Sequence, residues 1–185
     1  MTTMTKLQIP KTKGFTLIET LIAISILVLA VTGAFAAAQN GISSATFSKD
    51  QIVAFYLAEE GIEEIRNLRD QNGLAGVSWL SGIAGSVNDP CYFGNVCMVD
   101  AVSPDKVISK CGTEAGSCPV LKQDPDTGFF GYDSDWADSP FKREVQLVQV
   151  SPSNSHEVTI VVTVTWAKGL LSRQFQAKEN IFDWQ

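Results

Sequence analysis

Residues 13–31 read KGFTLIETLIAISILVLAV, in which a lysine and a glycine precede an almost unbroken apolar run. The run continues to Ala38, and fifteen of the eighteen residues from Leu21 to Ala38 are apolar. At about 1.5 Å per residue, a helix over residues 15–39 would cover a hydrocarbon core about 30 Å thick. The segment is therefore long enough and apolar enough to span a bilayer.

Charge is distributed unevenly on the two sides of this run. Residues 1–14 form a basic leader with three lysines and no acid, a local charge of +3. The rest of the chain has 11 basic and 20 acidic side chains, a net charge of −9. By the positive-inside rule, the N-terminus stays in the cytoplasm and residues from about 49 onward lie outside. The acidic balance argues against nucleic acid as a partner, because its phosphates need clustered Lys and Arg.

The apolar run has three common interpretations. A secretory signal fits the basic start, and residues 34–36 or 36–38 could serve as its cleavage site. A permanent single-pass anchor fits the length equally well. A buried helix of a soluble domain is the least favoured, since so long an uncharged run is rare in a domain of this size.

Glu19 distinguishes these structures, because a carboxylate in a spanning segment is costly and neither a signal peptide nor a plain anchor requires one. A positively charged group that pairs with the carboxylate would explain why Glu19 is there. The sequence from Lys13 to Glu19, KGFTLIE, resembles the processing site of type IV prepilins and type II secretion pseudopilins. The resemblance is strong over residues 13–31 and covers about a tenth of the chain.

The resemblance implies a specific set of processing and assembly steps. A membrane prepilin peptidase would cut after Gly14 on the cytoplasmic side, and the new amine of Phe15 would be N-methylated by a methyltransferase. Glu19 would pair with the α-amino group of a neighbouring subunit during assembly. The partners would be other pilin or pseudopilin subunits, a membrane platform protein and an assembly ATPase. The mature chain would leave the cytoplasmic membrane for a pilus or a pseudopilus.

Two details refine this resemblance. The apolar helix lacks the proline of many major pilins, so that Gly33 and Gly41 are its only weak points. The stretch AEEGIEEIRNLR at residues 58–69 resembles minor pilins and minor pseudopilins more than major subunits. The presence of Glu19 argues against the pseudopilin type that lacks this acid and caps the tip. The sequence does not distinguish a pilus from a secretion pseudopilus or a DNA-uptake fibre.

The expected organisation is a spanning and assembly helix over residues 15–40, an amphipathic helix over residues 41–72 and an outer domain over residues 73–185. Apolar residues recur at spacings of three and four from residue 52 onward. The predicted apolar face comprises Ile52, Phe55, Tyr56, Ala58, Ile62, Ile65 and Leu68. The predicted polar face comprises Glu59, Glu60, Glu63, Glu64, Arg66, Arg69 and Asp70, and serves as a solvated surface or as a docking face for another subunit.

The C-terminal part of the chain indicates β structure. Residues 74–87 are rich in Gly and Ser and predict a loop, whereas residues 141–150, 156–166 and 171–182 predict strands. The middle strand alternates cleanly, with its apolar residues at even positions from Val158 to Trp166. We expect an α+β fold like that of pilins, in which a long helix packs on an antiparallel sheet of three or four strands.

Four cysteines, Cys91, Cys97, Cys111 and Cys118, lie between the predicted helix and sheet. An even number in a segment outside the membrane predicts two disulfides, and four cysteines allow three pairings. Sequential pairing is favoured because both loops would be short. A zinc site is the alternative, but the spacings between the four cysteines lack the usual CxxC motif.

Five aspartates crowd the stretch DPDTGFFGYDSDWAD, which runs from Asp124 to Asp138. Such oxygens could hold calcium, but Gly128 stands where an EF-hand needs a third oxygen ligand, and a solvated turn is the preferred interpretation. Four aromatic residues of this loop are expected to pack over the sheet rather than to form a binding patch; they are Phe129, Phe130, Tyr132 and Trp136.

Catalysis has little support in the sequence. His156 is the only histidine, and the nucleophile-elbow, phosphate-loop and dinucleotide glycine motifs are all missing. We therefore expect no enzyme, no catalytic or metal-binding residues and no cofactor. Two function classes remain, a structural subunit of a filament and a binding module that is membrane-anchored or secreted and unrelated to filaments.

Overall fold

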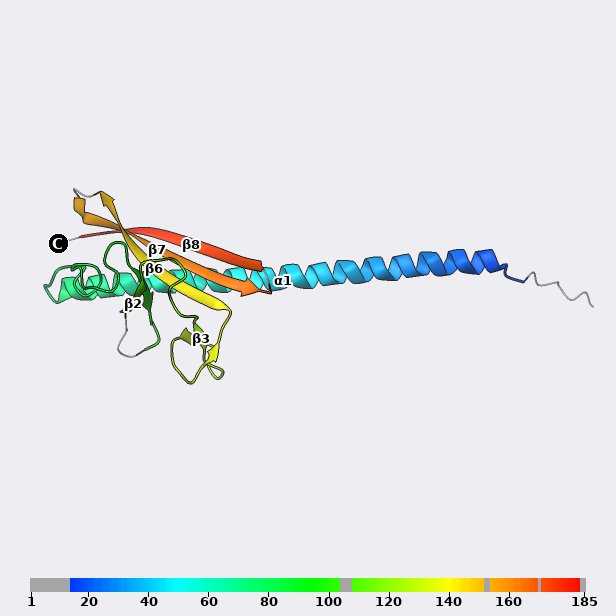
Figure 1. Ribbon diagram of the computed structural model, residues 1–185, viewed down its shortest axis with the longest axis horizontal. Coiled ribbons are helices and arrows are strands. Elements are labelled where there is room, and N and C mark those ends of the chain that lie inside the picture. The colour runs from blue at the N-terminus through cyan, green and yellow to red at the C-terminus, as the bar shows by residue number, and fades with distance from the viewer. Residues whose placement is uncertain (1–13, 104–107, 152–153, 170, 184–185) are drawn as a thin grey trace, which may run out of the picture. The chain divides into compact units, whose positions relative to one another are not determined.

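A computed structural model describes residues 14–103, 108–151, 154–169 and 171–183 (Figure 1). The chain divides into two compact units, Met1–Phe47 and Ser48–Gln185. Helix α1 (Leu17–Leu74) contributes to both units and continues through Gly33 and Gly41 without interruption. No proline interrupts its backbone hydrogen bonds, and Ala and Leu, which favour helices, recur throughout.

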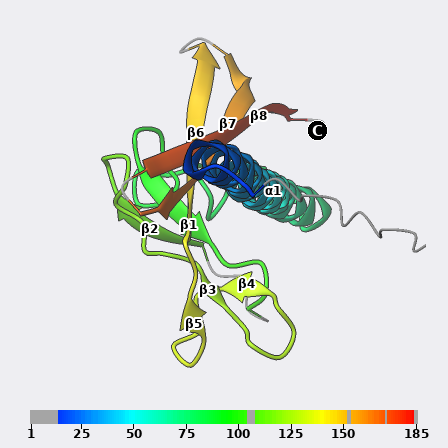
Figure 2. The ribbon, with the colours of Figure 1, turned by 90° about the vertical axis from the view of Figure 1, so that its right-hand side faces the viewer.

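The main sheet of the second unit has five antiparallel strands in the order β2-β1-β6-β7-β8 (Figure 2). The predicted strands correspond to β6 (Phe141–Ser151), β7 (Asn154–Lys168) and β8 (Leu171–Phe182). The α+β fold is confirmed, whereas the expectation of three or four strands is wrong. The two additional strands, β1 (Val96–Val99) and β2 (Ile108–Gly112), lie in the cysteine-containing stretch and are too short to show a clear alternation.

A second, smaller sheet is built from the aspartate-rich loop. Its strands are β3 (Lys122–Gln123), β4 (Phe130–Gly131) and β5 (Ala137–Asp138), in the order β4-β3-β5. Leu121 joins this sheet to the start of β6, because its amide donates to the carbonyl of Phe141 at 2.8 Å. Figures 1 and 2 both place the small sheet and strand β8 on opposite sides of α1.

The core of the second unit lies between α1 and one face of the main sheet. The alternation predicted for β7 is confirmed, since its apolar side chains from Val158 to Trp166 at even positions are all buried. The register pairs Val162 with Val145 of β6 and with Ala177 of β8. On α1 the buried residues are Ala54, Leu57, Ala58, Gly61, Ile62, Glu64, Ile65 and Arg69.

This burial corrects the predicted helix faces. Ala58, Ile62 and Ile65 are buried as expected, but Ile52, Phe55 and Tyr56 are exposed. On the predicted polar face, Glu64 and Arg69 are buried, and the partly exposed Glu60 contacts the buried Arg143. Arg66 pairs with Glu63 of the same helix at 3.2 Å and with Glu179 of β8 at 3.5 Å.

Gly61 lies where α1 packs closely on the sheet. A Cβ atom at this position would lie 3.3 Å from both Cδ of Arg143 and Cγ1 of Val162. We expect Gly61→Val to lower the free energy of unfolding of the second unit by about 1–3 kcal/mol, the usual cost of overpacking a filled core. The matched control is Gly41→Val, at a glycine of the same helix with nothing within 4 Å. Thermal unfolding in detergent measures both variants, and an equal effect of the two would contradict the close packing.

Candidate functional site

The predicted processing site lies directly before helix α1. Gly14 and Phe15 are exposed and lie outside regular secondary structure, and Phe15 is 71% exposed. A protease needs an extended and accessible backbone at the bond that it cuts, and a peptide group inside a helix does not offer one. The bond between Gly14 and Phe15 therefore lies in an exposed segment outside the helix.

Glu19 lies in the first turn of α1, three residues after the residue that caps the helix start. The Thr16 hydroxyl and carbonyl accept from the Glu19 amide at 3.4 and 3.1 Å, so that Thr16 caps the helix. Thr16 and Glu19 have the spacing of a capping box. A carboxylate in the first turn also complements the positive end of the helix dipole.

The side chains of the apolar part of α1 are not buried by any other part of the described chain. All its large apolar side chains from Phe15 to Ile42 are exposed, and its most apolar 18-residue window has a mean hydropathy of 2.5. Its few hydroxyl groups bond back to the helix: Ser25 donates to the carbonyl of Leu21 and Thr32 to that of Val28, both at 2.8 Å. Length, composition and satisfied polar groups thus allow this part of the helix to cross a membrane.

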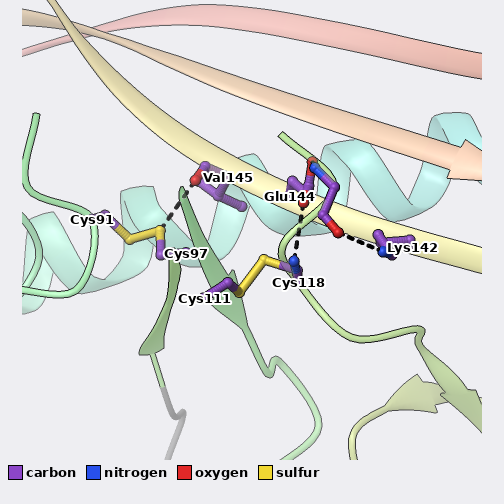
Figure 3. Close-up of a disulfide and its surroundings, with 8 residues drawn as sticks. Cys91, Cys97, Cys111, Cys118, Lys142, Glu144 and Val145 are labelled. Atoms are coloured by element: carbon purple, nitrogen blue, oxygen red, sulfur yellow. Dashed lines mark hydrogen bonds between the residues drawn. A yellow bond between two sulfur atoms is a disulfide. The ribbon is translucent and has the colours of Figure 1, made fainter. Parts of the chain in front are cut away.

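The cysteines of the second unit form two disulfides, Cys91–Cys97 and Cys111–Cys118 (Figure 3). This is the sequential pairing that the sequence favoured. The cysteines therefore leave no free thiols for a zinc site. Cys97 lies on β1 opposite Val145 of β6, so that the first disulfide fastens the loop before β1 to the main sheet.

The loop closed by Cys111 and Cys118 is held to β6 by two charged side chains (Figure 3). The Glu144 carboxylate is buried and accepts from the amides of Gly116 at 2.9 Å and Cys118 at 3.1 Å. Lys142 donates to the carbonyl of Gly116 at 2.8 Å. The sequence did not reveal this clamp, because its partners lie 26 to 28 residues apart in the chain.

We expect Glu144→Ala to release this loop. The change removes two hydrogen bonds to a charged acceptor, which are worth about 1.5–3 kcal/mol each. Hydrogen exchange at the Gly116 and Cys118 amides should therefore accelerate by at least about tenfold. The control is Glu114→Ala, which removes an exposed acid of the same loop. If both variants exchange as the parent protein does, Glu144 does not hold the loop.

Arg143 is a second buried charge that the sequence analysis did not identify. Its side chain is fully buried and joins α1 to the sheet: it donates to the carbonyls of Leu57 at 3.1 Å and Val99 at 2.7 Å and pairs with Glu60. The alternation of β6 could have revealed this burial, because Arg143 occupies the same inward-facing register as Phe141, Val145 and Leu147. Burial raises the pKa of the nearby Tyr132, and the positive charge of Arg143 opposes that rise.

The aspartate-rich loop is organised by hydrogen bonds of its own. Asp124 accepts from the amide of Asp126 at 2.9 Å and from the Thr127 hydroxyl at 2.5 Å. The Thr127 hydroxyl is the main cause that lowers the pKa of Asp124. In the part of the chain that the structure describes, no three His, Cys, Asp or Glu side chains are placed to hold a metal ion. His156 lies at the surface, where its Nδ1 is 3.2 Å from Asp183.

One aromatic residue of this loop, Phe130, packs on the main sheet as predicted, and Phe129 does not. Phe130 meets Phe141 edge to face at 5.8 Å, Trp136 packs against Gly131, and the Tyr132 hydroxyl is buried. Phe129 is 60% exposed, so the expectation that it packs over the sheet is wrong. The reason is the preceding turn, in which Gly128 has a φ of +78° and directs the next residue outward.

Comparison with known proteins adds one match, and it lies on the processing site. No curated protein and no solved structure matches the chain. The family model of the prokaryotic N-terminal methylation motif matches residues 9–35, which include Gly14, Phe15, Glu19 and most of the apolar run. The chain carries the N-terminal methylation signature of type IV pilins and pseudopilins.

Proposed function

We propose that this chain is a prepilin, a structural subunit of a type IV pilus or a type II secretion pseudopilus. The observation that carries the proposal is the methylation motif at the start of an apolar helix whose side chains have no cover in the described chain. A prepilin peptidase cuts after Gly14, Phe15 is N-methylated, and the subunit assembles through its apolar helix. The likeness of residues 58–69 to minor subunits favours a minor pilin or minor pseudopilin.

The same proposal gives the location and the partners. Before assembly the chain spans the cytoplasmic membrane once, with the basic leader in the cytoplasm and the second unit in the periplasm or outside the cell. Two disulfides in that unit fit an oxidising compartment. A platform protein and an assembly ATPase supply the work, so that the subunit itself has no catalytic task. Helix packing and the Glu19 pairing hold it in the filament.

Mass spectrometry of the mature N-terminus tests this proposal. We expect the protein from its native host to begin with N-methylated Phe15, and a Gly14→Val variant to keep its leader. A chain that begins near Gln39 would instead identify a secreted product of signal peptidase, and an intact Met1 would identify a plain membrane anchor. Either result would favour the alternative function, a binding module unrelated to filaments.

We also infer that the loop from Asp124 to Asp138 is not a calcium site. Both carboxylate oxygens of Asp124 already accept hydrogen bonds within the loop, so that calcium would have to displace them. Isothermal titration of calcium into the chelator-treated full chain should give no heat beyond dilution. A saturable heat that Asp126→Asn and Asp133→Asn reduce would assign the loop as a calcium site instead.

A further inference from the structure

Strands β7 and β8 form a hairpin whose end extends beyond the core. Lys168 and Leu171, the last pair of the register, lie directly opposite each other, and Trp166 lies opposite Arg173. Paired residues and every second residue along a strand share a face, so that these four side chains lie on one face of the hairpin. The core ends at Trp166, which is 5% exposed, whereas Leu171 is 67% exposed. Lys168, Leu171 and Arg173 are here called the hairpin end.

The hairpin end lies at the edge of the second unit at which α1 enters (Figure 1). Phe175 meets Phe55 edge to face at 5.7 Å. Four residues later, Glu179 pairs with Arg66 at 3.5 Å, so that β8 runs beside α1 in the same direction. Strand β8 begins four residues before Phe175, and that length of about 13 Å corresponds to about nine helical residues. The hairpin end therefore reaches the level of Ser48, the first residue of the unit.

The charge at this edge has the opposite sign to that of the whole unit. Residues 48–185 hold 11 basic and 19 acidic side chains, a net charge of −8. In residues 48–52 and 165–174 the net charge is +2, from Lys49, Asp50, Lys168 and Arg173. On the neighbouring strand, Lys142 and the preceding Asp138 cancel each other. The small sheet with the other clustered aspartates lies across α1 from β8 (Figures 1 and 2).

Along the chain, the surface closest to this edge is the membrane. With Glu19 at the cytoplasmic interface, the helical residues from Thr20 to Gln39 cover a hydrocarbon core about 30 Å thick. Ser48 follows Gln39 by nine residues of the same helix and so lies at most about 14 Å from the edge of that core. Headgroups fill roughly the first 5–7 Å of this distance, and a tilted helix shortens it further. Long basic side chains at the hairpin end can therefore reach the headgroups.

We propose that the hairpin end docks on the phospholipid headgroups of the cytoplasmic membrane before assembly. Leu171 enters the interfacial layer, and Lys168 and Arg173 contact the phosphates of anionic lipids. The contact holds the outer domain against the bilayer that the subunit leaves on assembly. The inference rests on the proposed function, because that function places the second unit outside the membrane. It concerns a single copy and applies to a minor subunit.

Photo-crosslinking to lipid tests the contact in the full chain. A benzoylphenylalanine replaces Leu171, and the purified chain is reconstituted in vesicles of phosphatidylethanolamine and phosphatidylglycerol with a radioactive label on the lipids. We expect a lipid adduct at position 171. The control places the same probe at Val148, an exposed apolar residue near the opposite end of the sheet, and should give none. Equal yields at the two positions, or adducts with protein alone, would overturn the contact.

Charge provides an independent measurement. Each basic side chain near an anionic membrane surface strengthens binding about fivefold. Lys168→Glu should therefore lower the yield of lipid adduct at position 171 at least about fivefold, and vesicles of phosphatidylcholine alone should give a comparable loss. The matched control is Lys178→Glu, which reverses an exposed lysine farther along β8 and should leave the yield unchanged. A yield that Lys168→Glu does not alter would show that the hairpin end makes no contact with anionic headgroups.

The outcomes separate this inference from the proposed function. Subunits that begin with methylated Phe15 but form no lipid adduct at position 171 would overturn the hairpin contact and leave the proposed function intact. A chain that begins near Gln39 would overturn both, because it has lost the helix that brings the hairpin end to the membrane.

Discussion

Glu19→Gln should abolish filament assembly while cleavage after Gly14 and the fold of the second unit remain unchanged. Opposite charges about 4 Å apart attract by roughly 4 kcal/mol at an effective dielectric near 20. A loss of that size would reduce incorporation of a subunit by about three orders of magnitude, since each 1.4 kcal/mol is about tenfold. The measurement is electron microscopy of fibres, together with mass spectrometry of the processed chain.

Glutamine removes the charge of the Glu19 side chain and keeps its size. A capping box accepts Glu or Gln three residues after the cap, so Glu19→Gln keeps helix capping and removes only the charge. Glu19→Ala also removes the charge and keeps the backbone amide that Thr16 caps, whereas Thr16→Ala removes the capping hydroxyl and keeps the charge. If assembly needs the charge, both Glu19 variants fail and Thr16→Ala assembles. Normal fibres from Glu19→Gln would contradict the pairing with a neighbouring amine.

The sequence predicted those parts of the molecule whose signals are local. The apolar run needs only its own composition to indicate a helix, and the alternation in residues 156–166 needs only its own period to indicate a half-buried strand. The disulfides followed from short spacings. The processing motif lies within seven consecutive residues, so that it could be found without any knowledge of the fold.

The remaining features depend on partners far apart in the chain. Glu60 and Glu64 looked like solvated residues because helix periodicity distinguishes polar from apolar faces but does not reveal a distant cation. Arg143 lies 83 residues from Glu60 and makes that part of the polar face a partly buried contact. The apolar period includes Ile52, Phe55 and Tyr56. These residues are nevertheless exposed, because β8 is the last strand of the sheet and the sheet does not extend over them. Packing between elements therefore decided which predicted face was buried.

The second large effect is expected at the buried Arg143. Arg143→Met retains most of the apolar stem but leaves the carbonyls of Leu57 and Val99 without their charged donor. Breaking a buried charged contact from one side costs about 3–5 kcal/mol. Because the Glu60 side chain is 36% exposed and can be hydrated, we expect a loss near the lower limit, about 3 kcal/mol.

Thermal unfolding followed by near-ultraviolet circular dichroism should show this loss as a melting temperature about 6–12 °C lower, at roughly 2–4 °C per kcal/mol for a unit of this size. The control is Arg66→Met, which breaks exposed ion pairs with Glu63 and Glu179 and should cost less than about 1 kcal/mol. Glu60→Gln should fall between the two, because Arg143 then retains both carbonyls. A melting temperature for Arg143→Met equal to that of Arg66→Met would show that the helix and the sheet are held by their apolar contacts alone.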